Sequence, residues 1–207
     1  GPATFSADRR LCAAPMYKPP KLIDDISANA NATALPDIGV WDVGSATLLR
    51  RISTETAIDR RMAFNGDGTR LAMLEASGTL RIWDITTGDE IASRSLYPWS
   101  NTPLIVPIPG GETFVTAGND GKVWEWSFAD GSAVRSREVK DTEYTALAVS
   151  RDGVRIAAGT SEGVLLWNLD TDEPPLELPM VGESVNALCF APDGLLIGLA
   201  VGTGTDV

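Results

Sequence analysis

The sequence contains no histidine, and this absence excludes several kinds of chemistry at once. Without an imidazole, the chain cannot build a Ser-His-Asp or Cys-His nucleophilic pair, and it cannot offer histidine ligands to zinc or haem. Only carboxylate, lysine, tyrosine or backbone chemistry remains. The composition thus argues against the commonest hydrolytic and metal-dependent active sites.

Basic residues are also scarce. The 207 residues include 17 Lys and Arg against 28 Asp and Glu, which gives a net charge of -11 and an isoelectric point near 4.4. We expect no nucleic-acid partner, because such binding depends mainly on Lys and Arg that displace counterions. No apolar stretch approaches the roughly 20 residues that a membrane-spanning helix needs, so we expect no membrane association.

The chain has only two cysteines, Cys12 and Cys189. Both lie within apolar runs, which is typical of buried free thiols rather than of a disulfide framework. Of the possible compartments, the cytoplasm is favoured.

Two short sequence motifs, called here the first and second phrase, recur along the chain. The first consists of an aromatic or aliphatic residue, a polar turn and an apolar run. Its copies begin at Phe5, Phe64, Val149 and Phe190, with a looser copy at Ile108. The second phrase ends in a tryptophan. These tryptophans are 42, 43 and 41 residues apart, at Trp41, Trp83, Trp126 and Trp167. Two independent phrases with one period indicate a repeat protein.

Within each period, short apolar or alternating runs are bounded by Gly, Asp, Asn and Pro, which is typical of strands and tight turns. In the second repeat we expect strands at 59–64, 70–74, 79–85 and 90–95. One such meander cannot bury both of its faces, whereas meanders stacked around a ring can. The predicted fold class is therefore all-β, a β-propeller of four-stranded antiparallel blades.

The second phrase resembles the repeat of the WD-repeat β-propeller family. Trp41-Asp42 and Trp83-Asp84 match the Trp-Asp pair, whereas Trp126-Ser127 and Trp167-Asn168 are degenerate copies. The resemblance covers essentially the whole chain. It departs in one respect, because family repeats often open with Gly-His, whose imidazole joins a hydrogen-bond network with an Asp and the Trp. We therefore expect packing here to depend more on the apolar strands.

The period also predicts that the propeller is incomplete in this chain. We expect blades at about 3–52, with an insertion at 15–37, and at about 57–96, 101–139 and 143–179, followed by a half blade at about 184–207. The next repeat tryptophan falls at position 209, beyond Val207. Three arrangements are open: further blades in the same longer chain, a second chain that completes the ring, or four closed blades with a spare half blade.

The insertion in the first repeat holds four of the candidate partner-binding residues. It begins with an amphipathic and cationic segment in an otherwise acidic protein, and these residues are Tyr17, Lys18, Lys21 and Leu22. In the resembled family, loops between the second and third strands share a rim with the connections between blades, and partner peptides commonly dock there. The resemblance therefore implies partner binding, and a tolerated surface loop is the competing interpretation.

Two more tryptophans lie outside the repeat position. Trp99 and the nearby Tyr97 belong to the connection between the second and third blades, so they are candidates for a partner-binding anchor or for a cap on the seam between blades. Trp124 alternates with Trp126 and is expected to pack against a neighbouring sheet.

Other charged positions have structural interpretations. The Asp-Gly pairs that begin at Asp67, Asp152 and Asp193 are turn formers, because both residue types tolerate tight turns. Arg50-Arg51 and Arg60-Arg61 are interpreted as solvated or strand-edge charges.

The sequence offers no catalytic constellation, no metal-ligand cluster and no cofactor loop, so we predict a non-enzymatic protein without a cofactor. The resemblance implies an interaction or sensing scaffold that presents loops of one propeller face to a protein or peptide. Two alternatives stay open. One is the sensor domain of a larger multidomain signalling or effector protein, and the other is a propeller enzyme whose active site lies in the central channel and needs further blades.

Overall fold

The computed structural model describes residues 3–16, 37–53, 58–75, 77–96, 104–180, 184–194 and 196–200. In these ranges every regular element is a strand, and no helix is long and apolar enough to cross a bilayer. The strands form four sheets of four strands and one of two, each antiparallel and ordered as in the chain. The all-β class predicted from the repeats is confirmed.

The strand bounds follow the repeat. The first sheet contains β1 (Thr4–Phe5), β2 (Leu11–Met16), β3 (Asp37–Asp42) and β4 (Thr47–Ile52). The second contains β5 (Ile58–Phe64), β6 (Arg70–Glu75), β7 (Thr79–Asp84) and β8 (Glu90–Ser95). The third contains β9 (Leu104–Pro107), β10 (Thr113–Ala117), β11 (Lys122–Ser127) and β12 (Ala133–Glu138). The fourth contains β13 (Ala146–Val149), β14 (Arg155–Gly159), β15 (Gly163–Asn168) and β16 (Leu176–Pro179), and the fifth β17 (Val185–Phe190) and β18 (Leu196–Ala200).

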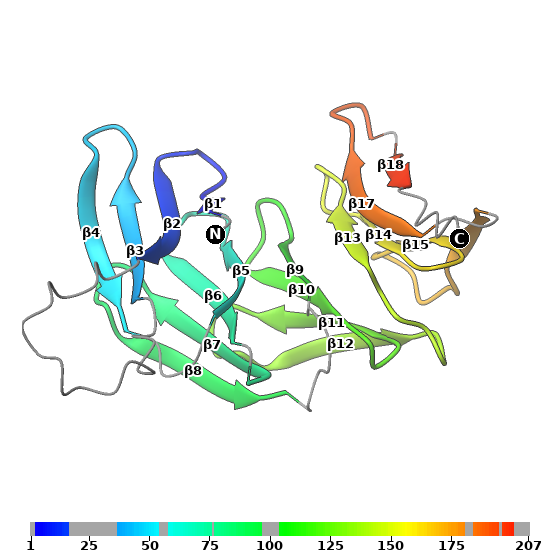
Figure 1. Ribbon diagram of the computed structural model, residues 1–207, viewed down its shortest axis with the longest axis horizontal. Helices are drawn as coiled ribbons and strands as arrows, with labels where there is room; N and C mark the ends of the chain where they lie inside the picture. The colour runs from blue at the N-terminus through cyan, green and yellow to red at the C-terminus, as the bar shows by residue number, and fades with distance from the viewer. Residues whose placement is uncertain are drawn as a thin grey trace, which may run out of the picture.

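Successive sheets stand side by side along an open arc (Figure 1). The first strand of each sheet lies on the inner side, where β5 contacts β1 and β9, and β13 contacts β9 and β17. The described sheets do not close into a ring (Figure 1). This arrangement is that of an incomplete β-propeller, as the sequence predicts.

The hydrophobic core lies between the sheets. One buried cluster joins the first and second sheets, a second joins the second and third, a third joins the third and fourth, and a smaller one joins the fourth and fifth. Strand β7 shows the cause, because Leu80 and Ile82 pack toward the third sheet while Trp83 faces the first. Alternation along a strand thus supplies both interfaces of one sheet.

Each repeat tryptophan of the second, third and fourth sheets faces the preceding sheet. Trp83, Trp126 and Trp167 belong to the interfaces with the first, second and third sheets respectively. The indole Nε1 of Trp126 donates a buried hydrogen bond of 2.8 Å to Oγ1 of Thr116. In the second sheet, Met73 occupies the position equivalent to Thr116, and the buried Nε1 of Trp83 has no hydrogen-bond partner among the described residues.

Trp124 packs as expected. Its ring lies 5.5 Å from the ring of Trp126, and it lies against the cluster that joins the second and third sheets. Its Nε1 donates to Oδ2 of Asp120 at 3.3 Å, and Nζ of Lys122 lies 5.6 Å from the ring centroid. These contacts hold the Nε1 edge of the Trp124 ring at the protein surface.

The two thiols differ from each other. Cys12 is half-buried, and burial raises the pKa of its thiol. Cys189 is exposed, which contradicts the prediction of a buried thiol. Its strand β17 has the fourth sheet on one face only, through Val185, Leu188 and Phe190, and Cys189 alternates with Leu188 and Phe190 toward the other face.

Arginines on outer strands join neighbouring sheets at their backbones. On β4, Nε of Arg50 donates to the carbonyl oxygen of Ile85 at 2.8 Å. On β12, Nη1 of Arg135 donates to the equivalent carbonyl oxygen of Leu169 at 2.7 Å, while its Nε contacts Oε2 of the buried Glu125 at 2.6 Å. Arg94 on β8 makes a longer contact of 3.5 Å to the carbonyl oxygen of Asp130.

The interpretation of Arg50-Arg51 as strand-edge charges agrees with their place on the outer strand β4, but these charges are not merely solvated. Arg50 crosses to the second sheet, and Arg51 pairs with the buried carboxylate of Asp37 at 2.5 Å. The guanidinium of Arg50 thus bonds carbonyl oxygens, and that of Arg51 bonds a carboxylate.

The buried indole bond gives a first prediction. Thr116→Val keeps the shape of the side chain but leaves Nε1 of Trp126 without an acceptor, so the free energy of unfolding should fall by about 1–3 kcal/mol. Urea denaturation followed by tryptophan fluorescence measures it. Thr113→Val on the same strand is the control, with an expected change within about 0.5 kcal/mol. Equal effects of the two variants would contradict the role of this bond.

The outer-strand arginines give a second prediction. Arg135→Ala leaves the buried carboxylate of Glu125 without its ion-pair partner and should cost about 2–3 kcal/mol, less than for a fully buried pair because Arg135 is partly exposed. Arg94→Ala removes only one long contact and should cost less than about 0.5 kcal/mol. Thermal unfolding of both variants tests the difference, and similar melting temperatures would contradict it.

Candidate interaction rim

Because the strands are antiparallel, their ends lie on two opposite rims of each sheet. The connection rim is the side on which β2, β6, β10 and β14 end and β3, β7, β11 and β15 begin, and the fourth strand of each four-stranded sheet ends there too. The turn rim is the opposite side, which holds the β1–β2 turn, the β3–β4 turn and their equivalents in the other sheets. The strand ends that flank the insertion and the connection from β8 to β9 lie on the connection rim.

The six candidate partner-binding residues lie outside the described residues, and they are Tyr17, Lys18, Lys21, Leu22, Tyr97 and Trp99. Their role stays a prediction. The strands on either side of the insertion are described: Pro15 pairs with Ile38 and Met16 with Asp37. The connection therefore comprises residues 17–36, slightly less than the expected 15–37.

A groove opens on the connection rim of the fourth sheet. Its volume is about 410 Å³, and three segments line it: the β12–β13 crossover at 139–143, the β14–β15 turn with the start of β15 at 160–165, and the end of β16 at 177–179. Gly163 has a φ of 147°, and a Cβ there would collide with the backbone of Leu178. Glycine thus lets β15 and β16 approach closely beneath the groove.

Four carboxylates line this groove, on Asp141, Glu143, Glu162 and Glu177, against the single amine of Lys140. All four are exposed, and none of these carboxylates forms a hydrogen bond or ion pair with another residue in the described part of the chain. The sequence analysis did not identify them. The available signal was the run from Lys140 to Glu143 in a crossover on the rim already favoured for binding.

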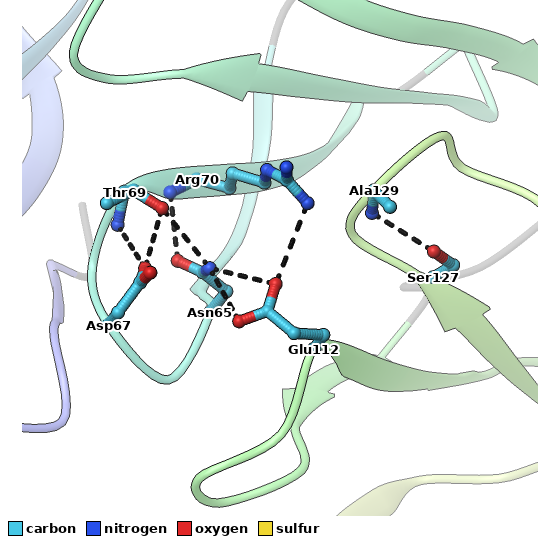
Figure 2. Close-up of polar contacts among 7 residues, drawn as sticks. All are labelled: Asn65, Asp67, Thr69, Arg70, Glu112, Ser127 and Ala129. Atoms are coloured by element: carbon cyan, nitrogen blue, oxygen red, sulfur yellow. Dashed lines mark hydrogen bonds and ion pairs between the residues drawn. The ribbon is translucent and has the colours of Figure 1, made fainter.

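The turn rim is different, because its polar side chains bond to one another. Figure 2 shows the β5–β6 turn, where Nδ2 of Asn65 donates to both carboxylate oxygens of Glu112 at 3.3 Å, across to the third sheet. Nη1 of Arg70 lies 3.6 Å from Oε2 of the same carboxylate. The backbone amide of Gly66 also donates to the carbonyl oxygen of Gly111 at 3.3 Å. These contacts fasten the second sheet to the third.

Aspartates organise the individual turns on this rim. Oδ1 of Asp67 accepts hydrogen bonds from the backbone amide and hydroxyl of Thr69 at 2.8 and 2.6 Å (Figure 2). Asp8 and Asp152 make equivalent bonds within their own turns. These hydrogen bonds hold the pKa of each of the three carboxyls below its usual value. The prediction that the recurrent Asp-Gly pairs are turn formers is confirmed for Asp67 and Asp152.

A second groove, of about 500 Å³, lies on the turn rim between the first two sheets. Its acidic side chains are Asp8, Asp42 and Asp67, which already accept hydrogen bonds from their own turns. Among the described residues, no group of three or more Cys, Asp or Glu is arranged to hold a metal ion. The connection-rim groove is therefore the better candidate for binding.

Comparisons with known proteins identify the repeats. A WD repeat-containing protein 91 homolog from Dictyostelium discoideum is 25% identical over 179 residues, which cover 75% of this chain and 23% of the relative. Cilia- and flagella-associated protein 52 from Chlamydomonas reinhardtii is 30% identical over 63% of this chain and 22% of its own length. The guanine nucleotide-binding protein subunit beta of Saccharomyces cerevisiae is 32% identical over 48% of this chain and 26% of its own length.

These matches at modest identity support a relationship of the chain to WD-repeat proteins. The chain spans about a quarter of the length of these relatives. No family model matches it. The chain departs from the resembled repeat because it has no histidine. Its polar contacts between strands and between sheets include the indole bond to Thr116 and the outer-strand arginines.

The turn aspartates give a third prediction. The pKa of each folded carboxyl lies below the ordinary aspartate value of 3.8, so its contribution to stability is present above that pH and is lost as the pH falls further. Replacing Asp8, Asp67 and Asp152 by Asn keeps an acceptor oxygen but removes the titration. The triple variant should lose less stability than the unmodified chain between about pH 5 and pH 2.5, measured by urea denaturation.

The control for this experiment is Asp89→Asn, whose carboxylate accepts no hydrogen bond from another described residue. This variant should follow the acid response of the unmodified chain. If the triple variant does so too, the turn hydrogen bonds do not cause the acid sensitivity.

Proposed function

We propose that this chain is a non-enzymatic protein-interaction scaffold that presents its connection rim to a protein or peptide. Proteins of the WD-repeat family are generally scaffolds of this kind. The observation that carries the proposal is the groove of about 410 Å³ on the connection rim, whose charged side chains are not engaged within the described protein. Sheets packed on both faces hold its walls in fixed positions.

We propose that the aromatic and cationic residues predicted from the sequence contact the same partner. The strand ends that flank the β2–β3 connection and the β8–β9 crossover lie on the same rim as the groove, by the order of the strands. Tyr17, Lys18, Lys21, Leu22, Tyr97 and Trp99 are thus proposed as further partner contacts, with the aromatic residues as anchors.

A fourth prediction tests the rim. The chain with both Tyr17→Ala and Trp99→Ala should lose at least about tenfold in affinity for proteins captured by the unmodified chain, as expected when anchors are truncated. Quantitative capture followed by titration of each purified partner measures this. Val134→Ala is the control, because Val134 is exposed on the outer strand β12 away from the rim. Equal loss in both variants, or no loss in either, would contradict a rim-based scaffold.

We also propose that a further sheet covers the outward face of the first sheet, from the same longer chain or from a second chain. Phe5, Cys12 and Trp41 are register neighbours on this face. Phe5 is 55% exposed, whereas Phe64, at the same repeat position in the second sheet, is 2% exposed beneath the first sheet. The face thus has the apolar pattern of the covered sheets.

A fifth prediction follows for the chain by itself. Phe5→Asp should reduce self-association, because it places a charge on an apolar face that otherwise drives contact between copies. Sedimentation velocity at several concentrations measures this. Val134→Asp, which adds the same charge to a residue that is 51% exposed on β12, should leave self-association unchanged. A monodisperse monomer in the unmodified chain would contradict the proposal.

A further inference from the structure

We propose that the connection-rim groove binds a cationic peptide segment whose Lys or Arg side chains alternate with apolar ones. This inference rests on the proposed scaffold function and assigns the chemistry of one partner. The lining of the groove, its shape and the outer strand beside it support the inference separately.

The first support is charge complementarity. Asp141, Glu143, Glu162 and Glu177 come from three different segments of the chain and converge on one groove with only Lys140 to oppose them. Their carboxylates have no hydrogen bond or ion pair with another described residue. The aspartates of the turn rim, in contrast, are engaged by their own turns. The groove carboxylates therefore have no bonded partner among the described residues and can accept a cation.

The second support is the apolar part of the lining. Val164 is buried, and the half-buried Val139 and Leu165, together with Leu178 and Pro179, complete this surface. A Lys or Arg side chain carries an aliphatic stem that packs on such a surface while its charged end stays near carboxylates and water. A small inorganic cation would not use this apolar area.

The third support comes from β16, the outer strand of the fourth sheet. At the positions where β12 carries Arg135 and Arg137, β16 carries Leu176 and Leu178. These leucines are 59% and 39% exposed, and Leu178 lines the groove. The arginines of β12 bond to the next sheet, whereas Leu178 is an exposed apolar side chain in the lining of the groove. An apolar side chain that alternates with the cations of a peptide would cover Leu178.

The test uses labelled peptides of known charge and the full chain. We expect a fluorescent Arg-Leu repeat octapeptide to bind, and a Ser-Leu repeat of the same length to bind at least about fivefold more weakly, by fluorescence anisotropy at low salt. Raising the salt to about 0.5 M should weaken the Arg-Leu peptide several-fold, because screening shortens the range of exposed charges.

The decisive variant combines Glu143→Gln with Glu162→Gln. Two exposed charge pairs contribute about 0.2–1 kcal/mol each, so affinity for the Arg-Leu peptide should fall by roughly 2- to 30-fold. The matched control combines Asp89→Asn with Glu173→Gln, which removes the same charge from exposed positions outside the groove. It should change affinity by less than about twofold.

The outcomes separate this inference from the scaffold proposal. Equal affinities in the groove and control variants, or equal binding of the Arg-Leu and Ser-Leu peptides, would overturn the cationic specificity. If proteins captured through the rim still depend on Tyr17 and Trp99 in that case, the scaffold proposal stands alone. Binding of the Arg-Leu peptide that is selective for the unmodified groove supports the inference even before any natural partner is identified.

Discussion

The whole structure depends on the fact that a four-stranded sheet has two faces and cannot bury either by itself. Alternation along each strand sends one set of apolar side chains toward the preceding sheet and the other toward the next. Phe64 and Trp83 thus pack on the first sheet, while Leu80 and Ile82 pack on the third. Each sheet is stabilised by its neighbours, which explains why the repeat period is uniform although the residues vary.

Polar contacts refine this apolar arrangement where the family histidine is missing. Thr116 accepts the indole hydrogen of Trp126 in the third sheet, whereas Met73 gives Trp83 no such acceptor. The bond is therefore not required in every repeat. Outer-strand arginines add contacts that do cross between sheets, through carbonyl oxygens that any residue can offer. A diverged repeat can keep its packing because backbone acceptors survive side-chain replacement.

Much of the fold could be predicted from the sequence because strand periodicity and turn chemistry are local. The expected strands of the second repeat match β5 to β8 to within one residue at each end. Long-range polar contacts could not be predicted in the same way. Arg50 has its acceptor 35 residues away in the next sheet, and the equivalent position of the second sheet is Ala92, so the repeat does not reveal this contact. The exposure of Cys189 depends similarly on which face of β17 is covered.

The candidate groove could not be predicted for the same reason. Its carboxylates lie far apart in the sequence, and only the return of β16 along β15 brings Glu177 to the side of Glu143 and Glu162. The exchange of arginine for leucine on β16 has two consequences at this place. It removes arginines that in the third sheet bond to carbonyl oxygens of the next sheet, and it leaves Leu178 exposed in the lining of the groove. The groove thus combines carboxylates that have no bonded partner among the described residues with an exposed leucine. For this reason we assign it to a partner rather than to the packing of the sheets.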